Sequence, residues 1–330
     1  MSRITGGRVN LGVARETTRG TCVNPTFWIP WVNFTFDDKV TSVDSGEALG
    51  VIEDSHEKFV VEKFADGDVE GEVRDDSFGL YLYALLGSLS TSAPLVAGTY
   101  DHTFTLAETN QHTTLTLSTE DPNGDKQYCK SAINTFELNA VLGEYIKYNI
   151  GFMSRGSHDT SVDSDIGSSG VENKFRAQDV ELKLAAARAG LAAASAISIQ
   201  SVRLTAQKNV MRKQMLGTVQ SDDFINQAFA VDGEFTLPYD DQTYRDLMLE
   251  NTYNAVQITL KNSDVALTDG ATYHPTITIV LPRCGFKDWT PNRPKGELFE
   301  QTIGFKGYYD QANSENSIYS IVLRNDTASY

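Results

Sequence analysis

The chain has 330 residues, enough for two domains of about 150 residues with a core each. Its 44 acidic side chains outnumber its 28 basic ones, giving a formal charge of −16. This balance excludes strong nucleic-acid binding, which needs Lys and Arg on the phosphates. No run approaches the roughly 18 apolar residues of a membrane span, and the first twenty residues lack the apolar core of a secretory signal. We therefore expect an intracellular product without a membrane anchor.

Period-two alternation rich in Thr, Val, Ile, Phe and Tyr predicts strands along most of the chain. In the first half these are 31–36, 58–64, 67–73, 99–106, 113–118, 131–139 and 144–152. In the second half they are 196–207, 227–236, 255–261, 276–281 and 297–308. Turn-forming sequences separate them, so we predict a mainly β, antiparallel protein.

Each half also carries one predicted short helix. In the first, Asp76 or Ser77 is the expected cap and Gly87 the expected end. Its apolar face is spaced as in a helix: Phe78, Leu82, Leu85, Leu86 and Leu89. In the second, Asp240 or Asp241 caps 242–250. The Ala-rich stretch 182–196 is left open between helix and strand, because alanine favours a helix but Gly190 interrupts it.

The two halves contain diverged copies of one sequence pattern. The segment 143–152 (GEYIKYNIGF) is similar to 296–305 (GELFEQTIGF), and the segment 69–73 (VEGEV) is similar to 231–235 (VDGEF). Fainter pairs match 31–40 with 201–210, and Leu49-Gly50 with Leu216-Gly217. We therefore predict two tandem domains of one fold. The predicted division is an N-terminal arm at 1–24, a first domain at 25–155, a linker at 156–174 and a second domain at 175–330.

Candidate chemistry is sparse. Cys22, Cys129 and Cys284 are far apart and form no metal-binding spacing, so we expect separate buried or half-buried thiols. His158-Asp159 could be drawn as part of a metal cluster, but it lies in the predicted linker, where rigid support is lacking. The 121–125 segment begins like a calcium loop, yet Ala132 at its twelfth position cannot ligate, so we expect a hairpin turn. We predict no catalytic, cofactor or metal site.

Acidic residues crowd 53–76. The simple interpretation is a solvated sheet face. The functional interpretation is that some of these acids line a surface that repels a passing polyanion at about a Debye length, roughly 8 Å. The candidate acids, taken from both copies of the repeat, are Glu70, Glu72, Asp232 and Glu234.

The segments 70–91 (EGEVRDDSFGLYLYALLGSLST), 98–106 (GTYDHTFTL) and 15–31 (RETTRGTCVNPTFWIPW) resemble the tail tube proteins of long-tailed, non-contractile bacteriophages. The resemblance implies β-sandwich or barrel-like domains, each with one flanking helix, in stacked rings around a channel. It also implies a long loop that reaches the neighbouring ring, here 37–57 and, in the second copy, 207–226. The candidate loop residues are Asp37, Asp38, Lys39, Asp44, Glu47, Lys208, Arg212 and Lys213.

Since single-domain members resembling this fold form hexameric rings, a duplicated chain predicts a trimeric, pseudo-hexameric ring. DNA would pass without specific binding, and the implied partners are tape measure, head–tail joining and tail-tip proteins. The expected location is the virion tail, assembled in the host cytoplasm. The termini, 1–24 and 324–330, are expected to order on assembly.

Two alternatives remain. One is a distal tail or tail-tip ring protein, which would form a single ring. The other is a carbohydrate- or cell-surface-binding module using the aromatic faces of Trp28, Trp31 and Trp289. An enzyme is not expected, because no acid, base and nucleophile converge in the sequence.

Overall fold

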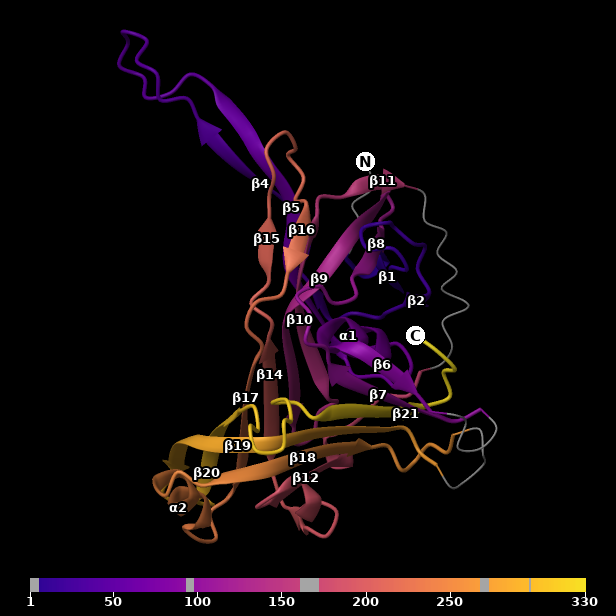
Figure 1. Cartoon of the computed structure of the whole chain (residues 1–330), viewed down its shortest axis with the longest axis vertical. Helices are drawn as coiled ribbons and strands as arrows, with labels where there is room; N and C mark the ends of the chain where they lie inside the picture. The colour runs from indigo at the N-terminus through magenta and orange to yellow at the C-terminus, as the bar shows by residue number, and fades with distance from the viewer. Residues whose placement is uncertain (1–5, 93–97, 161–171, 268–272, 297) are drawn as a thin grey trace.

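The computed structural model describes residues 6–92, 98–160, 172–267, 273–296 and 298–330. This part of the chain is mainly antiparallel β-structure, with the short α-helices α1 (Phe78–Leu86) and α2 (Thr243–Leu249). The molecule is elongated, and a long hairpin projects from one end (Figure 1). The predicted fold class is therefore confirmed as mainly β with one short α-helix in each half.

The first half contains strands β1 to β11. Their bounds are β1 (Asn10–Arg15), β2 (Phe27–Trp28), β3 (Asn33–Phe34), β4 (Asp37–Asp44), β5 (Lys58–Glu72), β6 (Gly87–Thr91), β7 (Tyr100–Leu106), β8 (Leu115–Glu120), β9 (Asp125–Val141), β10 (Lys147–Arg155) and β11 (His158–Thr160).

The second half contains strands β12 to β21. Their bounds are β12 (Val180–Ala185), β13 (Ala196–Ile197), β14 (Ser201–Gln207), β15 (Met211–Lys213), β16 (Asp223–Ile225), β17 (Ala230–Pro238), β18 (Tyr253–Lys261), β19 (Thr276–Asn292), β20 (Glu300–Gly307) and β21 (Ser320–Asn325).

One continuous antiparallel sheet runs through both halves. Its order is β4–β5–β10–β9–β14–β17–β20–β19. The halves meet where β9 pairs with β14, with Ser201 opposite Val141 and Gln207 opposite Thr135. We call this the central sheet.

The strand order of the first half recurs in the second. Both long strands, β9 and β19, pair in the central sheet through their C-terminal parts. Through its N-terminal part, β9 pairs with β8, which in turn pairs with β1. In the same way, the N-terminal part of β19 pairs with β18, which in turn pairs with β12. In addition, β21 pairs with β7, so the end of the chain returns to the first half.

The core is shared between the halves and lies on one face of the central sheet. A single cluster of buried residues includes Phe36, Phe136 and Phe152 from the first half and Phe235 and Phe305 from the second. Burying each such side chain contributes about 1.5–3 kcal/mol. The chain therefore folds around contacts between segments far apart in the sequence.

Helix α1 is buried almost all round, where the sequence predicted one apolar face. Its Tyr81 ring lies 5.5 Å from Tyr148 and 5.9 Å from Phe152, centroid to centroid. The helix ends at Gly87, as predicted, in the left-handed conformation with φ of 84°. Of the two predicted caps, Asp76 and Ser77, Ser77 occupies the N-cap position, but its hydroxyl makes no capping bond and donates to Glu172 at 2.7 Å.

At the start of α2 the N-cap position is held by Gln242 and not by Asp240 or Asp241 as predicted, although the Asp241 carboxylate accepts from the Thr243 N–H at 2.9 Å. The Ala-rich stretch, left open between helix and strand, is divided between the two. It begins in strand β12, which pairs along its length with β18, and continues into a short 3-10 helix at Arg188–Gly190. The 121–125 segment is the predicted hairpin turn between β8 and β9, in which the Asn123 N–H donates to Asp121.

The described parts of both terminal segments bond within the single chain. Strand β1 pairs over its whole length with β8, and the hydroxyl of Tyr330 donates to the carbonyl of Asp76 at 2.6 Å. Ordering only on assembly is therefore wrong for Asn10–Arg15 and for Tyr330. Most of the predicted linker, 161–171, lies outside the described residues, but His158–Thr160 pairs with β9.

Candidate functional surfaces

The central sheet has a polar face that both halves build. In an antiparallel sheet, residues directly opposite each other point to the same side. One row across the sheet runs Glu72, Lys147, Asn139, Arg203, Glu234 and Gly304. The next row runs Glu70, Asn149, Glu137, Thr205, Asp232 and Lys306. The structure therefore places all four candidate acids on one face of one sheet.

The opposite face of these strands is buried. Val69, Tyr148 and Leu204 alternate with the polar rows, and each is at most 2% exposed. The glycine of each repeated motif lies under an aromatic ring, because a Cβ at Gly71 would collide with Tyr148 and one at Gly233 with Phe305. The motif glycines thus let two aromatic rings of the core lie flat on the sheet.

Ion pairs cross-link the polar face. Arg203 reaches Glu137 at 2.6 Å, Lys287 reaches Asp232 at 2.8 Å and Lys174 reaches Glu72 at 2.6 Å. The hydrogen bond that Arg203 donates to Glu137 raises the pKa of Arg203, and the one that Lys287 donates to Asp232 raises the pKa of Lys287. The carboxylates of the two rows, with Asp68 and Asp288 beside them, outnumber the cations, so the face is acidic.

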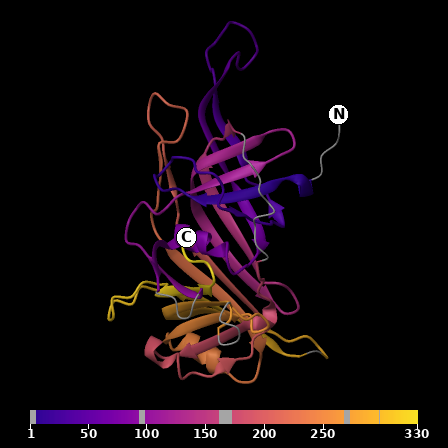
Figure 2. The same ribbon diagram turned by 90° about the vertical axis from the view of Figure 1, so that its right-hand side faces the viewer.

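Two hairpins, one from each half, extend side by side from the same end of the molecule (Figures 1 and 2). They are β4–β5 and β15–β16 with their connecting loops. The Lys63 N–H donates to the Val219 carbonyl at 2.7 Å, and the Gln214 amide donates to the Val61 carbonyl at 2.9 Å. We call them the paired hairpins.

The loops of the paired hairpins expose apolar side chains. Ile52 in one loop and Leu216 in the other are fully exposed. The neighbouring Gly50 and Gly217 have φ of 75° and 89°, a conformation that favours glycine and turns each loop back on itself. The sequence match of Leu49-Gly50 with Leu216-Gly217 therefore marks two loops at the same end of the molecule. Exposed apolar loop ends of this kind are suited to contact another protein surface.

Most candidate loop residues lie at the base of the paired hairpins, where they bond within the chain. Asp38 accepts from the Ser157 hydroxyl at 2.6 Å, and Lys39 pairs with Asp66. Arg212 stacks on Phe64 at 3.6 Å, and Lys213 pairs with Asp222 at 3.2 Å. Of the other four candidates, Asp37, Asp44 and Glu47 are exposed.

Lys208 is different from the other candidates, because only 2% of it is exposed. Its ammonium donates to the Ala84 carbonyl in the last turn of α1 at 2.9 Å, and burial lowers its pKa to about 7. A cation at this position satisfies a helix-end carbonyl. Lys208 thus joins β14 to α1 and has no free surface for another subunit.

The model of the phage tail tube protein family matches residues 6–307, nearly the whole chain. The chain belongs to this family. The match runs through both halves, so the tail tube family accounts for the central sheet and both hairpins together, and it indicates a structural component of the virion tail. The search of curated proteins found no match. Among the described residues of this tail tube protein, no helix is long and apolar enough to cross a bilayer.

The tryptophans of this tail tube protein pack within the chain. Trp28 is 8% exposed. The indole N–H of Trp31 donates to the Val9 carbonyl at 3.0 Å, and that of Trp289 donates to Gln301 at 2.9 Å. Their place in the sheet favours a packing role over a sugar-stacking platform.

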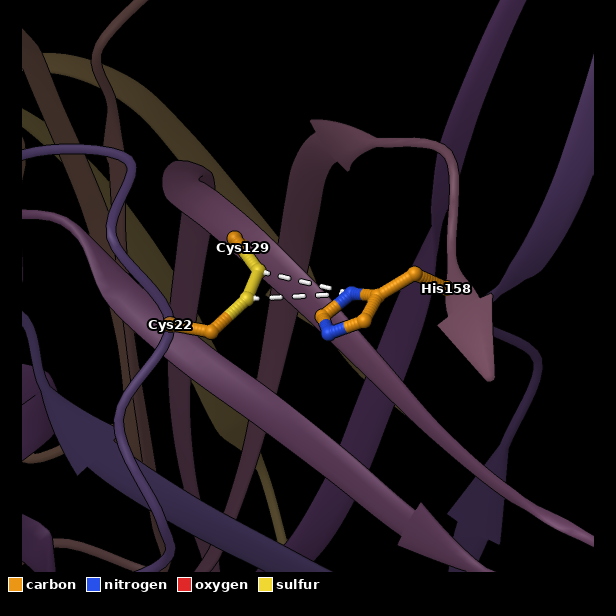
Figure 3. A group of neighbouring side chains, drawn as sticks. All are labelled: Cys22, Cys129 and His158. Atoms are coloured by element: carbon orange, nitrogen blue, oxygen red, sulfur yellow. Dashed lines mark hydrogen bonds between the residues drawn. A yellow bond between two sulfur atoms is a disulfide. The ribbon is translucent and has the colours of Figure 1, made fainter. Parts of the chain in front are cut away.

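The cysteines overturn one expectation. Cys22 and Cys129 form a disulfide, with 5.1 Å between their Cα atoms, although they are 107 residues apart. The imidazole of His158 lies beside them (Figure 3). Only Cys284 fits the expectation of a separate buried thiol, and burial raises its pKa. No local spacing in the sequence announces the pairing, because the fold alone brings the segments together.

The sequence also gave no indication of a buried cluster of three carboxyl groups. Asp75, Asp76 and Glu172 lie between the start of α1 and the end of the predicted linker. Asn173 donates to Asp75, Thr327 to Asp76 and Ser77 to Glu172. Burial raises the pKa of Asp75 to about 6 and that of Glu172 to about 7, and it also raises the pKa of Asp76.

Proposed function

We propose that this chain is the subunit of a tail tube in which three copies close each ring and rings stack end to end. The polar face of the central sheet would line the channel, and DNA would pass along it without specific binding. The observation that carries the proposal is that both repeats contribute acids to one face of one uninterrupted sheet. In this proposal the two tandem domains are 25–155 and 175–330.

The strand pairing proposed to close the ring has an equivalent inside the chain. The central sheet ends at β3 and β4 on one side and at Asp288–Asn292 of β19 on the other, and among the described residues these edges pair only inward, with β5 and β20. Unpaired edges favour pairing with another chain. In the sequence repeat, β3 corresponds to β14, and β19 corresponds to β9. The strands β14 and β9 pair with each other inside the chain.

The same pairing between copies joins the end of one sheet to the start of the next. Arg203 lies opposite Asn139 within the chain. The match of 31–40 with 201–210 relates Arg203 to Asn33, and the offset between 143–152 and 296–305, continued along the preceding strand, relates Asn139 to Asn292. We therefore expect Asn33 of one copy to lie opposite Asn292 of its neighbour. Three such junctions, with three junctions inside the chains, would close the ring with a pseudo-sixfold appearance.

Stacking would use the paired hairpins. Both project from the same end of the molecule, and their loops expose Ile52 and Leu216. A contact from one end of a subunit to the other end of the next is heterologous and does not close, so it yields a filament. This feature favours a tube over the alternative of a distal tail or tail-tip protein that forms a single ring.

The acidic face would keep DNA from adhering. Its carboxylates repel phosphates over about 8 Å at physiological salt, so the polyanion is not held by counterion release. We place the protein in the virion tail, assembled in the host cytoplasm with tape measure, head–tail joining and tail-tip proteins as partners. Its role in this proposal is structural, without catalysis or a cofactor.

Cysteine cross-linking tests the ring. Asn33→Cys together with Asn292→Cys should give covalent trimers and no larger species, because Cα atoms of opposed strand residues are about 4.5–5.5 Å apart, within disulfide range. Each single variant is the matched control and should give no trimer. Electron microscopy of the assembled protein should show hollow tubes. A monomer at all concentrations would contradict the proposal, and isolated rings that never stack would favour the distal tail alternative.

A further inference from the structure

Three soft metal ligands from separate segments meet near the N-terminal end of β9. Cys22 lies in the segment after β1, Cys129 in β9 and His158 in β11. The Nδ1 atom of His158 is 3.8 Å from each of the two sulfurs, and the imidazole faces the sulfur pair (Figure 3). The ligand atoms of all three residues lie within 4.8 Å of one another.

The segment that carries Cys22 is held rigidly. The buried carboxylate of Glu16 accepts from the Gly20 N–H at 2.6 Å and from the Lys130 N–H at 2.5 Å. The Val23 N–H donates to the Thr116 hydroxyl at 3.2 Å. Backbone bonds on both sides of Cys22 therefore fix its position against β9.

The other two ligands are positioned by strand pairing. His158 lies opposite Gln127, two residues before Cys129, so the histidine and the cysteine are diagonal neighbours on adjacent strands. Lys130 follows Cys129 with φ of 62°, at an irregularity in the pairing of β8 with β9. Such bulges redirect side chains, and they are common beside functional sites. The rigid support that the sequence lacks at His158 is supplied here by the sheet.

We propose that, in the reduced chain, Cys22, Cys129 and His158 bind one zinc ion. The two thiolates and Nδ1 supply three of four tetrahedral positions, and water supplies the fourth. With Zn–S of about 2.3 Å and Zn–N of about 2.0–2.1 Å, a tetrahedral site places the nitrogen about 3.6 Å from each sulfur and the two sulfurs about 3.8 Å apart. The observed 3.8 Å from Nδ1 to each sulfur is within about 0.2 Å of the first value. The second value requires the two sulfurs, joined as a disulfide here, to move apart on reduction.

Two cationic side chains lie near the segment that carries Cys22. The side chains of Lys130 and Arg155 both approach Gly20, two residues from Cys22, where a Cβ would be 3.0 Å from one and 3.6 Å from the other. Cations near a cysteine favour the thiolate, which is the form that binds metal. The site does not depend on the proposed tube function.

The zinc site and the disulfide exclude each other, because both use the same two sulfurs. Reduction by a dithiol transfers two electrons and two protons to the Cys22–Cys129 bond, giving two thiols, while the dithiol becomes a disulfide. Zinc then displaces the two thiol protons. The state of the site thus follows the redox state of the compartment, and either state ties the segment after β1 to β9.

Titration of the full-length reduced protein with zinc alone tests the proposal. We expect one equivalent per chain, and cobalt in place of zinc should show sulfur-to-metal charge-transfer absorption with a tetrahedral d–d spectrum. Cys22→Ser, Cys129→Ser and His158→Ala should each weaken binding by more than the roughly 10–100-fold that loss of an outer partner costs. Oxidation to the disulfide should abolish binding.

The matched controls are Cys284→Ser, which removes the remaining thiol, and His56→Ala, which removes an exposed histidine elsewhere. Both should bind zinc as the parent does. Circular dichroism of each variant without metal separates a lost ligand from a lost fold. The proposal is overturned if the folded, reduced chain binds no zinc, if cobalt shows no sulfur-to-metal band, or if the ligand variants bind as well as the controls.

Discussion

Arg203 of the second half reaches Glu137 of the first across the junction of β9 and β14, with 2.6 Å between Nη2 and Oε2. The pair lies on the polar face of the central sheet, and Glu234 of β17 approaches the same guanidinium at 3.8 Å. The two halves are therefore linked on one face by charge and on the other by the shared core.

This ion pair should contribute little to stability, because exposed pairs are worth about 0.2–1 kcal/mol. Arg203→Ala, Glu137→Ala and the double variant form a cycle whose coupling, measured by denaturant unfolding, we expect to be below about 1 kcal/mol. A coupling of several kcal/mol would mean that the polar face holds the halves together. A small value would show that charges on this face can be changed without loss of the fold.

Charge reversal then tests the channel. Glu70→Lys, Asp232→Lys and Glu234→Lys together should leave rings and tubes intact but slow DNA ejection, because phosphates would be attracted to the wall. Adding Glu72→Lys should increase the effect. The measurement is ejection rate and infectivity of phage assembled with the variant. The matched control reverses Glu108, Asp240 and Glu250, which are exposed outside the polar face. Equal effects in both sets would place the channel elsewhere.

The paired hairpins are tested at their loops. Ile52→Asp and Leu216→Asp should permit rings but block stacking, since each side chain is fully exposed in the single chain and would be buried in a ring contact. Stability should change by less than about 0.5 kcal/mol, as for other surface substitutions. Leu249→Asp, at an exposed position on α2, is the control. Electron microscopy would show tubes of normal length from both loop variants if the loops make no such contact.

The motif glycines should be intolerant of a methyl group. Gly71→Ala and Gly233→Ala force the rings of Tyr148 and Phe305 to move, which costs about 1–3 kcal/mol in a packed core. Gly46→Ala is the control, because a Cβ there meets nothing within 4 Å. Free energies of unfolding from denaturant titration should separate the two classes. Similar values for all three variants would show that the core repacks freely.

The carboxyl cluster predicts a pH dependence. Burial raises the pKa of Asp75 to about 6 and of Glu172 to about 7, above their usual values, so the folded chain holds protons that the unfolded chain releases. Stability from these groups is present in acid and is lost as pH rises through 6 to 7. Glu172→Gln should flatten this loss, by at most about 3 kcal/mol at pH 8.

The measurement is the unfolding temperature of the parent and of Glu172→Gln between pH 5 and 8. Glu108→Gln, at an exposed site, is the control and should follow the parent. A parent whose stability rises steadily over this range, with no difference from Glu172→Gln, would show that the cluster is not strained by ionisation.

The sequence by itself determined the features that depend on local pattern. Alternation indicated the strands, and the apolar spacing before Gly87 located α1, because side-chain periodicity and backbone freedom act over a few residues. The sequence repeat predicted that Glu70 and Glu72 of the first copy and Asp232 and Glu234 of the second would occupy equivalent positions. Two copies of one fold present equivalent residues on the same face of a sheet. The resemblance carried by 70–91, 98–106 and 15–31 indicated the tail tube family.

Only the tertiary structure decided how these pieces meet. The pairing of β9 with β14 joins the halves into one sheet, and nothing near Thr135 or Ser201 in the sequence specifies its partner. The meeting of Cys22 with Cys129 and His158, and the burial of Lys208 against α1, also depend on contacts between residues far apart in the chain. Such contacts are fixed by packing of the whole core, because the burial that stabilises them is shared among many residues.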